Sequence, residues 1–201
     1  MTYAKHLLAP LAFALLTFPA MAAEKLSLTE ISRYINDLKI AQAEFTQINA
    51  DGTISTGTIY IRRPGRARFE YNPPSDALVI AGGQQLAIFD AKSNTGPTQY
   101  PLRRTPLNLI LARNVDLSRA DMVVGHSFDG TTTTVIAQDP DNPEYGTIAL
   151  TFTDDPVELR QWVITDDIGD QTTVILSRLE QVASLNNNLF NISRETELRQ
   201  R

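Results

Sequence analysis

The sequence predicts a mainly β protein of the α+β class, built on one antiparallel sheet of roughly ten strands that is either open or curled into a barrel. Three observations predict this fold. Runs of alternating apolar and polar residues recur along the chain, turn-forming Gly, Pro, Asn and Asp pairs separate them, and apolar residues with helical spacing occur in two places. Neither an internal repeat nor a low-complexity linker interrupts this order, so we expect one domain.

Composition sets limits on function. The chain has 201 residues, of which 42% are hydrophobic, enough for one sizeable core. Its 18 basic and 23 acidic residues give a net charge of −5, which argues against nucleic-acid binding and against docking on an anionic membrane by bulk charge. With no cysteine and two histidines, thiol chemistry and multi-histidine metal sites are excluded. We predict no cofactor and no metal.

Residues 1–22 have the pattern of a secretory signal peptide. Lys5 and His6 precede an apolar run over residues 7–18, and small residues follow at Ala20-Met21-Ala22. The alternative is an uncleaved anchor, but no basic stop-transfer cluster follows the apolar run. We therefore expect residues 23–201 to form an exported domain, which without cysteine depends on packing for its stability.

The first helix is predicted from Ser27-Leu28-Thr29-Glu30, a capping box. The helix is expected to extend to about Lys39, after which the period changes to two and predicts a strand through Phe45. Asp51-Gly52 then predicts a hairpin turn. The apolar positions that share one face of the helix are Leu28, Ile31, Ile35 and Leu38.

Strict alternation continues through residues 57–63 and 66–71, on either side of a Pro64-Gly65 turn. In the second run Ala67, Phe69 and Tyr71 are expected to point inward. Arg66, Arg68 and Glu70 are expected to point outward. Further strands are predicted over residues 78–81, 86–89, 122–125, 131–137, 146–153, 159–164, 171–179 and 190–192.

A second, shorter helix is predicted to begin at Thr105-Pro106, with Thr105 as its cap and proline at the first helical position. Residues 107–112 are apolar apart from Asn108. A helix that is apolar on nearly every side has to be covered on more than one face.

Arg63 does not fit its surroundings. Its phase in the alternation places the guanidinium on the face that carries Ile59 and Ile61, where an unpaired charge would cost several kcal/mol. An arginine at this position needs acceptors, and free carbonyls at helix C-termini would serve. The alternative is a change of phase at the strand end that releases Arg63 to solvent.

Catalytic motifs are weak. Residues 125–129 resemble a nucleophile elbow around Ser127, but the last glycine is missing and the segment lies between two predicted strands. The aspartates of residues 166–170 lack the spacing of a calcium loop and predict a polar hairpin loop. Asn191-Ile192-Ser193 matches a glycosylation sequon on a predicted strand. We predict no enzymatic activity.

Several segments, taken in order, are similar to one known family: residues 43–47, 57–65, 68–71, 105–113, 170–173 and 190–192. They resemble the LolA family of periplasmic carriers of outer-membrane lipoproteins. The R-P-G-x-x-R stretch from Arg63 to Arg68 is the most specific of them.

The resemblance implies an unclosed antiparallel β-barrel of about ten or eleven strands, with a helical lid over an apolar cavity that holds the acyl chains of a lipoprotein. Arg63 matches the family's lid-latching arginine. The implied acyl-binding residues are Leu28, Ile31, Ile35, Phe45, Ile59, Ile61, Phe69, Tyr71, Leu107, Ile110 and Leu111.

The implied function is that of a periplasmic chaperone, which takes lipoproteins released by an inner-membrane ABC transporter to an outer-membrane lipoprotein receptor. The chain departs from many family members at Ala67, where they carry a bulky aromatic residue, and in its short charged tail over residues 193–201. We expect a monomer. Alternative functions with the same fold are a sensor of exposed lipoproteins and a carrier of free lipid or glycolipid. A fourth possible function is the hydrolysis of lipid esters with Ser127 as the nucleophile.

Overall fold

The computed structural model describes residues 24–90, 96–119 and 121–200, so the predicted signal peptide lies outside the described residues. The helices are α1 (Leu28–Asp37), η1 (Leu102–Arg104), α2 (Leu107–Leu111), η2 (Pro143–Tyr145), η3 (Asn187–Phe190) and α3 (Ile192–Arg199), where η marks a short 3-10 helix. The strands are β1 (Ile40–Ile48), β2 (Ile54–Arg62), β3 (Ala67–Tyr71), β4 (Leu78–Gly82), β5 (Gln85–Phe89), β6 (Thr98–Pro101), β7 (Val123–Phe128), β8 (Thr133–Gln138), β9 (Thr147–Asp154), β10 (Val157–Thr165), β11 (Gln171–Leu176) and β12 (Glu180–Gln181).

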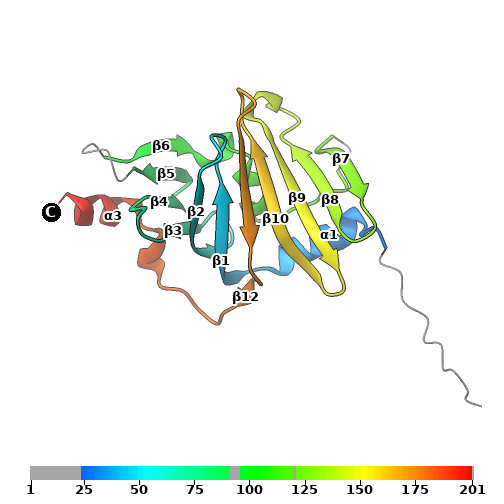
Figure 1. Ribbon diagram of the computed structural model, residues 1–201, viewed down its shortest axis with the longest axis horizontal. Helices are drawn as coiled ribbons and strands as arrows, with labels where there is room; N and C mark the ends of the chain where they lie inside the picture. Colours follow the sequence, from blue (N-terminus) through cyan, green and yellow to red (C-terminus); the bar gives the residue numbers. More distant parts are fainter. Residues whose placement is uncertain (1–23, 91–95, 120, 201) are drawn as a thin grey trace, which may run out of the picture.

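All strands of the described chain belong to one antiparallel sheet of 12 strands, in the order β6-β5-β4-β3-β2-β1-β11-β10-β9-β8-β7, with β12 also paired to β1. Because β6 and β7 form its two edges, the sheet is open, which is one of the two forms that the alternation allowed and the one that the resemblance implied. Figure 1 shows α1 behind the strands at one end of the sheet and α3 at the other end. None of the described helices is long and apolar enough to cross a membrane.

Helix α1 begins at the predicted capping box. Ser27 Oγ accepts from the Glu30 N–H at 3.2 Å, and Glu30 Oε2 accepts from the Ser27 N–H at 2.9 Å. The helix ends at Asp37 rather than near Lys39. Tyr34 attaches it to the sheet, since its ring meets Phe152 of β9 edge-on at 5.8 Å and its hydroxyl accepts from the Leu159 N–H of β10 at 3.1 Å.

The inward alternation of β2 and β3 is confirmed. Ile59, Ile61, Ala67 and Phe69 are all buried and belong to the main core. This core lies between the inner face of the sheet and the helices α1 and α2. The predicted hairpin at Asp51-Gly52 is also present, and Gly52 adopts a φ of +80°, which glycine tolerates best.

The outer face of β3 and β4 differs from the prediction. Arg68 was expected in solvent, but it is 9% exposed, because the C-terminal residues cover it. The strand predicted over residues 190–192 is wrong: these residues end η3 and begin α3, which Asn191 caps by accepting from the Arg194 N–H at 2.9 Å. The apolar Phe190 and Ile192 on either side of a polar residue give the alternation of a strand, although these residues do not form one.

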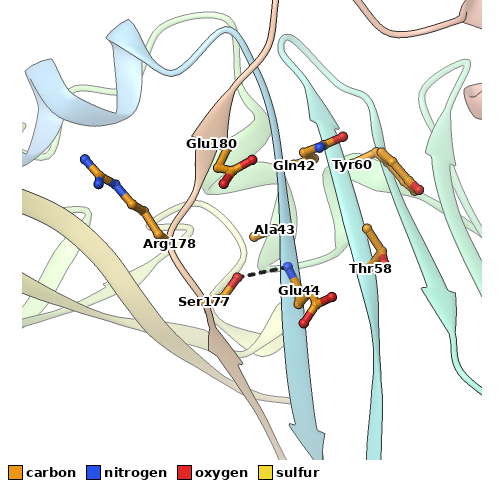
Figure 2. Close-up of a pocket in the computed structure, with 8 residues that line it drawn as sticks. All are labelled: Gln42, Ala43, Glu44, Thr58, Tyr60, Ser177, Arg178 and Glu180. Atoms are coloured by element: carbon orange, nitrogen blue, oxygen red, sulfur yellow. Dashed lines mark hydrogen bonds between the residues drawn. The ribbon is translucent and has the colours of Figure 1, made fainter.

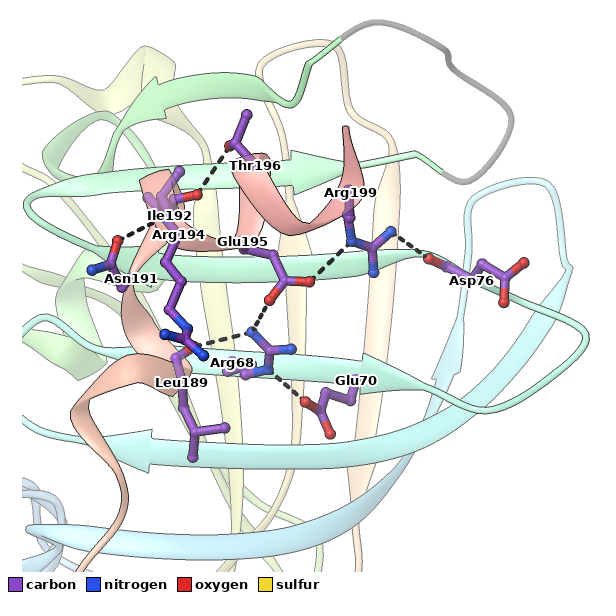
Figure 3. Close-up of polar contacts among 10 residues, drawn as sticks. All are labelled: Arg68, Glu70, Asp76, Leu189, Asn191, Ile192, Arg194, Glu195, Thr196 and Arg199. Carbon is purple, nitrogen blue, oxygen red and sulfur yellow. Dashed lines mark hydrogen bonds and ion pairs between the residues drawn. The ribbon is translucent and has the colours of Figure 1, made fainter. Parts of the chain in front are cut away.

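The covering segment is fixed by a charged cluster, shown in Figure 3. The Arg68 guanidinium donates to Glu70 at 2.6 Å, to Glu195 of α3 at 3.2 Å and to the Leu189 carbonyl at 3.1 Å. A Cβ atom on Gly82 would lie 2.2 Å from the Phe190 carbonyl oxygen, so only glycine allows this close approach. Beneath lies a second apolar cluster of Leu78, Ile80, Ala87 and Phe89, with Ile192 packed on it.

Two other details of the prediction are corrected. Thr105 does not cap α2, because its hydroxyl donates to the Leu102 carbonyl at 2.8 Å and Pro106 occupies the N-cap position without a side-chain bond. Strand β6 was not predicted, since its residues lack apolar alternation. The loop after β10 is the predicted polar hairpin: Asp166 Oδ1 accepts from the N–H groups of Ile168 and Asp170 at 3.1 and 2.9 Å.

Candidate lid and acyl-binding site

Arg63 lies directly after β2 and is 7% exposed, so the alternative that it reaches solvent is wrong. Its Nη1 donates to the carbonyls of Ile35 and Leu38, the latter at 3.5 Å, at the C-terminal end of α1. Its Nη2 donates to the Ala112 carbonyl at the end of α2, at 2.6 Å, and to Asn36 Oδ1 at 3.3 Å. One guanidinium therefore joins both helices to the sheet.

This cation is balanced by carbonyl dipoles. In the described part of the chain, no carboxylate lies within ion-pairing distance of Arg63. Burial lowers the pKa of Arg63, while the C-terminal carbonyls of two helices supply the negative end of the helix dipole. Its Nε has no hydrogen-bond partner among the described residues, so the guanidinium is not fully satisfied even with both helices in place.

The backbone of the following turn reinforces the same contacts. The Arg63 N–H donates to the Lys39 carbonyl at 2.8 Å, just beyond α1. The Gly65 N–H donates to the Leu111 carbonyl of α2, also at 2.8 Å. The β2–β3 turn thus contacts the C-terminal ends of both helices through main chain and side chain together.

Asn36 of α1 was missed by the sequence reasoning. Its Oδ1 accepts from the Val115 N–H at 2.9 Å and its Nδ2 donates to the Val115 carbonyl at 2.7 Å. One turn earlier, Ser32 Oγ accepts from the Leu117 N–H at 2.9 Å. The segment that leads away from α2 is therefore held on α1. Polar residues at spacing i, i+4 beside the apolar face of α1 were the available signal.

The predicted acyl-binding residues all lie together in the main core, contributed by α1, β1, β2, β3 and α2. Leu28 and Tyr71 are partly buried, and the others are buried. Phe45 meets the rings of Phe69 and Tyr71 edge-on at 5.6 and 5.2 Å. These side chains pack on one another between the helices and the sheet.

Tyr71 adds a polar group to this core. Its hydroxyl donates to Gln47 Oε1 at 2.7 Å, and burial raises the pKa of Tyr71 to about 12. It is thus a neutral donor at physiological pH, placed beside Phe45.

The region that carries these contacts matches a known family. The profile described as "Outer membrane lipoprotein carrier protein LolA" matches residues 36–193, which include Arg63, Asn36 and α2.

The chain belongs to the LolA family.

Among its relatives is the outer-membrane lipoprotein carrier protein of Coxiella burnetii (strain CbuK_Q154), 24% identical over 180 residues, which cover 85% of this chain and 84% of the relative. The carrier protein of Nitrosomonas europaea is 27% identical over 195 residues, covering 90% and 89%. A solved LolA superfamily structure from Nitrosomonas europaea aligns with a TM-score of 0.44 at 9% identity, over 84% of this chain and 99% of that one.

Two hollows flank α2 in this LolA-family protein, and both are lined in part by Asn108 and Ala112. One has a volume of about 680 Å³ and lies toward the β2–β3 turn. The other, of about 620 Å³, lies toward β7 and β8. Their charges differ: the first is lined by Arg66, Arg103 and Arg113, and the second by Asp121, Asp139 and Asp141 together with Arg119.

A third hollow, of about 360 Å³, opens on the outer face of the sheet where β11 gives way to β12 (Figure 2). Gln42 and Glu44 project into it from β1, on the opposite face from the core residues Ala43 and Phe45. Ser177 Oγ accepts from the Glu44 N–H at 3.0 Å across this gap. Its lining is mostly polar, with Ala43 as an apolar member, and includes none of the predicted acyl-binding residues. Over the described residues, no group of three or more His, Cys, Asp or Glu side chains could hold a metal ion.

Proposed function

We propose that this LolA-family protein carries acylated lipoproteins through the periplasm, from an inner-membrane ABC transporter that releases them to an outer-membrane lipoprotein receptor. The observation that supports this most directly is Arg63, a buried cation that joins α1 and α2 over a core of apolar side chains. The family match and the carrier names of its relatives agree with it.

The physical task is to move a lipid anchor through water. Each exposed CH₂ group costs roughly 0.8 kcal/mol, so long acyl chains have to be shielded between two membranes. In this proposal α1 and α2 form the lid, and the predicted acyl-binding residues become the lining of a cavity when the lid moves away. No chemical step is needed, and the protein acts as a binding chaperone and not as an enzyme.

A carrier must also release its cargo. Tight apolar burial alone would make release slow, so the empty state needs a stabilisation of its own. In this proposal Arg63 is the lid latch: closing the lid supplies acceptors for a buried charge, and cargo entry breaks those bonds. The difference in stability between open and closed states then sets the affinity for cargo.

The test uses membrane vesicles that carry a purified lipoprotein together with its releasing transporter. Incubation with this protein should give a soluble one-to-one complex with the lipoprotein. The matched control is the same lipoprotein with its acylated cysteine replaced by serine, which should give no complex. Absence of a soluble complex with the acylated form, or equal capture of both forms, contradicts the proposal.

A further inference from the structure

The hollow of about 680 Å³ beside α2 combines an apolar base with a basic rim. It lies between the β2–β3 turn, the β4–β5 turn and α2. Leu102 and Leu111 line it and are 4% and 2% exposed, and both belong to the main core. The hollow therefore adjoins the apolar interior and is separated from it by the lid helix.

Three arginines line this hollow, and no Asp or Glu is among its lining residues. In the described part of the chain, none of Arg66, Arg103 and Arg113 pairs with a carboxylate within 4.0 Å. Arg66 meets Asn187 Oδ1 at 3.4 Å, and burial together with the neighbouring charge of Arg62 lowers its pKa. The positive potential here is thus not neutralised by the protein itself.

This basic site is local and does not follow from the overall charge. The whole chain carries −5, and the charged residues that line the hollow on the other side of α2 are three aspartates and one arginine. A site with guanidinium groups at its rim and leucines at its base fits an amphiphile with an anionic head. Guanidinium groups bind phosphate oxygens through paired, charge-assisted hydrogen bonds, and the phosphodiester of a phospholipid presents a negative charge on two non-bridging oxygens that several arginines can share.

We propose that this hollow binds the phosphate group of a phospholipid, whose acyl chain enters the core past Leu111. This inference rests on the proposed function, because it uses the same lid movement and the same acyl-binding residues. It adds a second substrate class, a lipid with a phosphate headgroup, and a headgroup site formed by Arg66, Arg103 and Arg113.

The test compares decyl phosphate, decyl maltoside and inorganic phosphate, with both alkyl compounds kept below their micelle concentrations. Trp162 gives the readout, since it is buried in the core with its ring 6.2 Å from that of Phe69, and calorimetry gives an independent dissociation constant. Decyl phosphate should bind about tenfold more tightly than decyl maltoside, as charge-assisted hydrogen bonds predict. Inorganic phosphate should bind far more weakly than decyl phosphate.

The variant that tests the headgroup site is Arg103→Ser/Arg113→Ser, in which the preference for phosphate should disappear while decyl maltoside binds as before. The matched control is Arg33→Ser/Arg194→Ser, which removes two exposed arginines elsewhere and should keep the preference. Equal affinities for the two alkyl compounds in the unchanged protein overturn the headgroup site and leave the proposed function standing. Inorganic phosphate binding as tightly as decyl phosphate overturns the assignment to a lipid. If neither alkyl compound binds, the proposed function fails as well.

Discussion

Arg63 donates a hydrogen bond to the side-chain oxygen of Asn36, an atom that also accepts a second hydrogen bond. The Arg63 Nη2 lies 3.3 Å from Asn36 Oδ1, and the same oxygen accepts from the Val115 N–H at 2.9 Å. This atom links the loop after β2, the last turn of α1 and the segment that follows α2. A change at either residue is therefore expected to affect the attachment of α2.

Substitution of Arg63 by leucine should separate binding from release. Arg63→Leu removes the hydrogen bonds that favour the closed lid, so the variant should still bind lipoprotein. It should transfer the lipoprotein to acceptor membranes at least about tenfold more slowly, because charge-assisted hydrogen bonds contribute on the order of 1.5–3 kcal/mol each. The measurement is the rate of transfer from a preformed complex.

The matched control for this variant is Arg62→Leu. Arg62 is the preceding residue, but it points to the other side and donates to the Leu185 carbonyl at 3.0 Å. This variant should transfer normally. Unchanged transfer by Arg63→Leu would remove the latch from the mechanism.

Asn36→Ala should loosen the segment after α2. It leaves the buried N–H and carbonyl of Val115 without partners, which should lower the free energy of unfolding by about 1–3 kcal/mol and speed hydrogen exchange at the Val115 amide. Asn36→Asp keeps the acceptor but loses the donor, so its effect on the Val115 amide should be smaller.

Ser32→Ala is the control for Asn36, because Ser32 bonds the same segment at Leu117 without touching Arg63. It should destabilise the protein but leave cargo release unchanged, whereas Asn36→Ala should alter both. If the two variants have the same release rate, Asn36 has a structural role alone.

Loss of Glu195 should detach the C-terminal helix from the sheet. Glu195 and Arg68 have side chains 16% and 10% exposed, and removing one partner of a buried pair leaves a charge poorly compensated. Glu195→Ala should make residues beyond 186 sensitive to limited proteolysis while the main core stays folded. Glu197→Ala, at an exposed position of the same helix, should remain resistant. Equal resistance of both variants would show that apolar contacts alone hold α3.

Stability should fall at alkaline pH because of Tyr71. Burial raises its pKa from an ordinary value of 10.0 to about 12, so the folded protein holds this proton more tightly than the unfolded chain. This contribution to the free energy of unfolding is complete below pH 10 and disappears as the pH rises through 12, with a size of about 3 kcal/mol.

Urea unfolding at pH 8 and pH 11.5 checks this expectation. Tyr71→Phe should lose less stability between these two values than the unchanged protein. Tyr100→Phe removes a tyrosine that is 48% exposed and should behave like the unchanged protein. An identical loss in Tyr71→Phe would exclude Tyr71 as the group responsible.

Local patterns predicted much of the fold. The capping box at Ser27 and the alternation through Ile59 and Ile61 are properties of neighbouring residues, and the structure confirms both. The burial of Arg63 was predictable as well, because its phase in the strand and the cost of burying a charge together require helix carbonyls nearby.

What could not be predicted depends on contacts between distant segments. Arg68 has the alternation of an outward residue, and its burial follows from α3, which lies more than a hundred residues later in the sequence. The spacing of Ser32 and Asn36 marks a polar edge on α1, but it does not identify the partner of Asn36, because that partner is the backbone of Val115. Thr105 has the residue type and position of a helix N-cap, but its hydroxyl donates to the Leu102 carbonyl of the preceding turn instead.

The most direct test of the account is a distance between spin labels on the lid and on the sheet, which the absence of native cysteine makes straightforward. Asn108→Cys labels α2, and Glu44→Cys labels the outer face of β1. We expect one narrow distance distribution in the empty protein and a longer distance with lipoprotein bound. We also expect a longer component in empty Arg63→Leu. An unchanged distance in the presence of bound lipoprotein would contradict the opening of a lid held by Arg63.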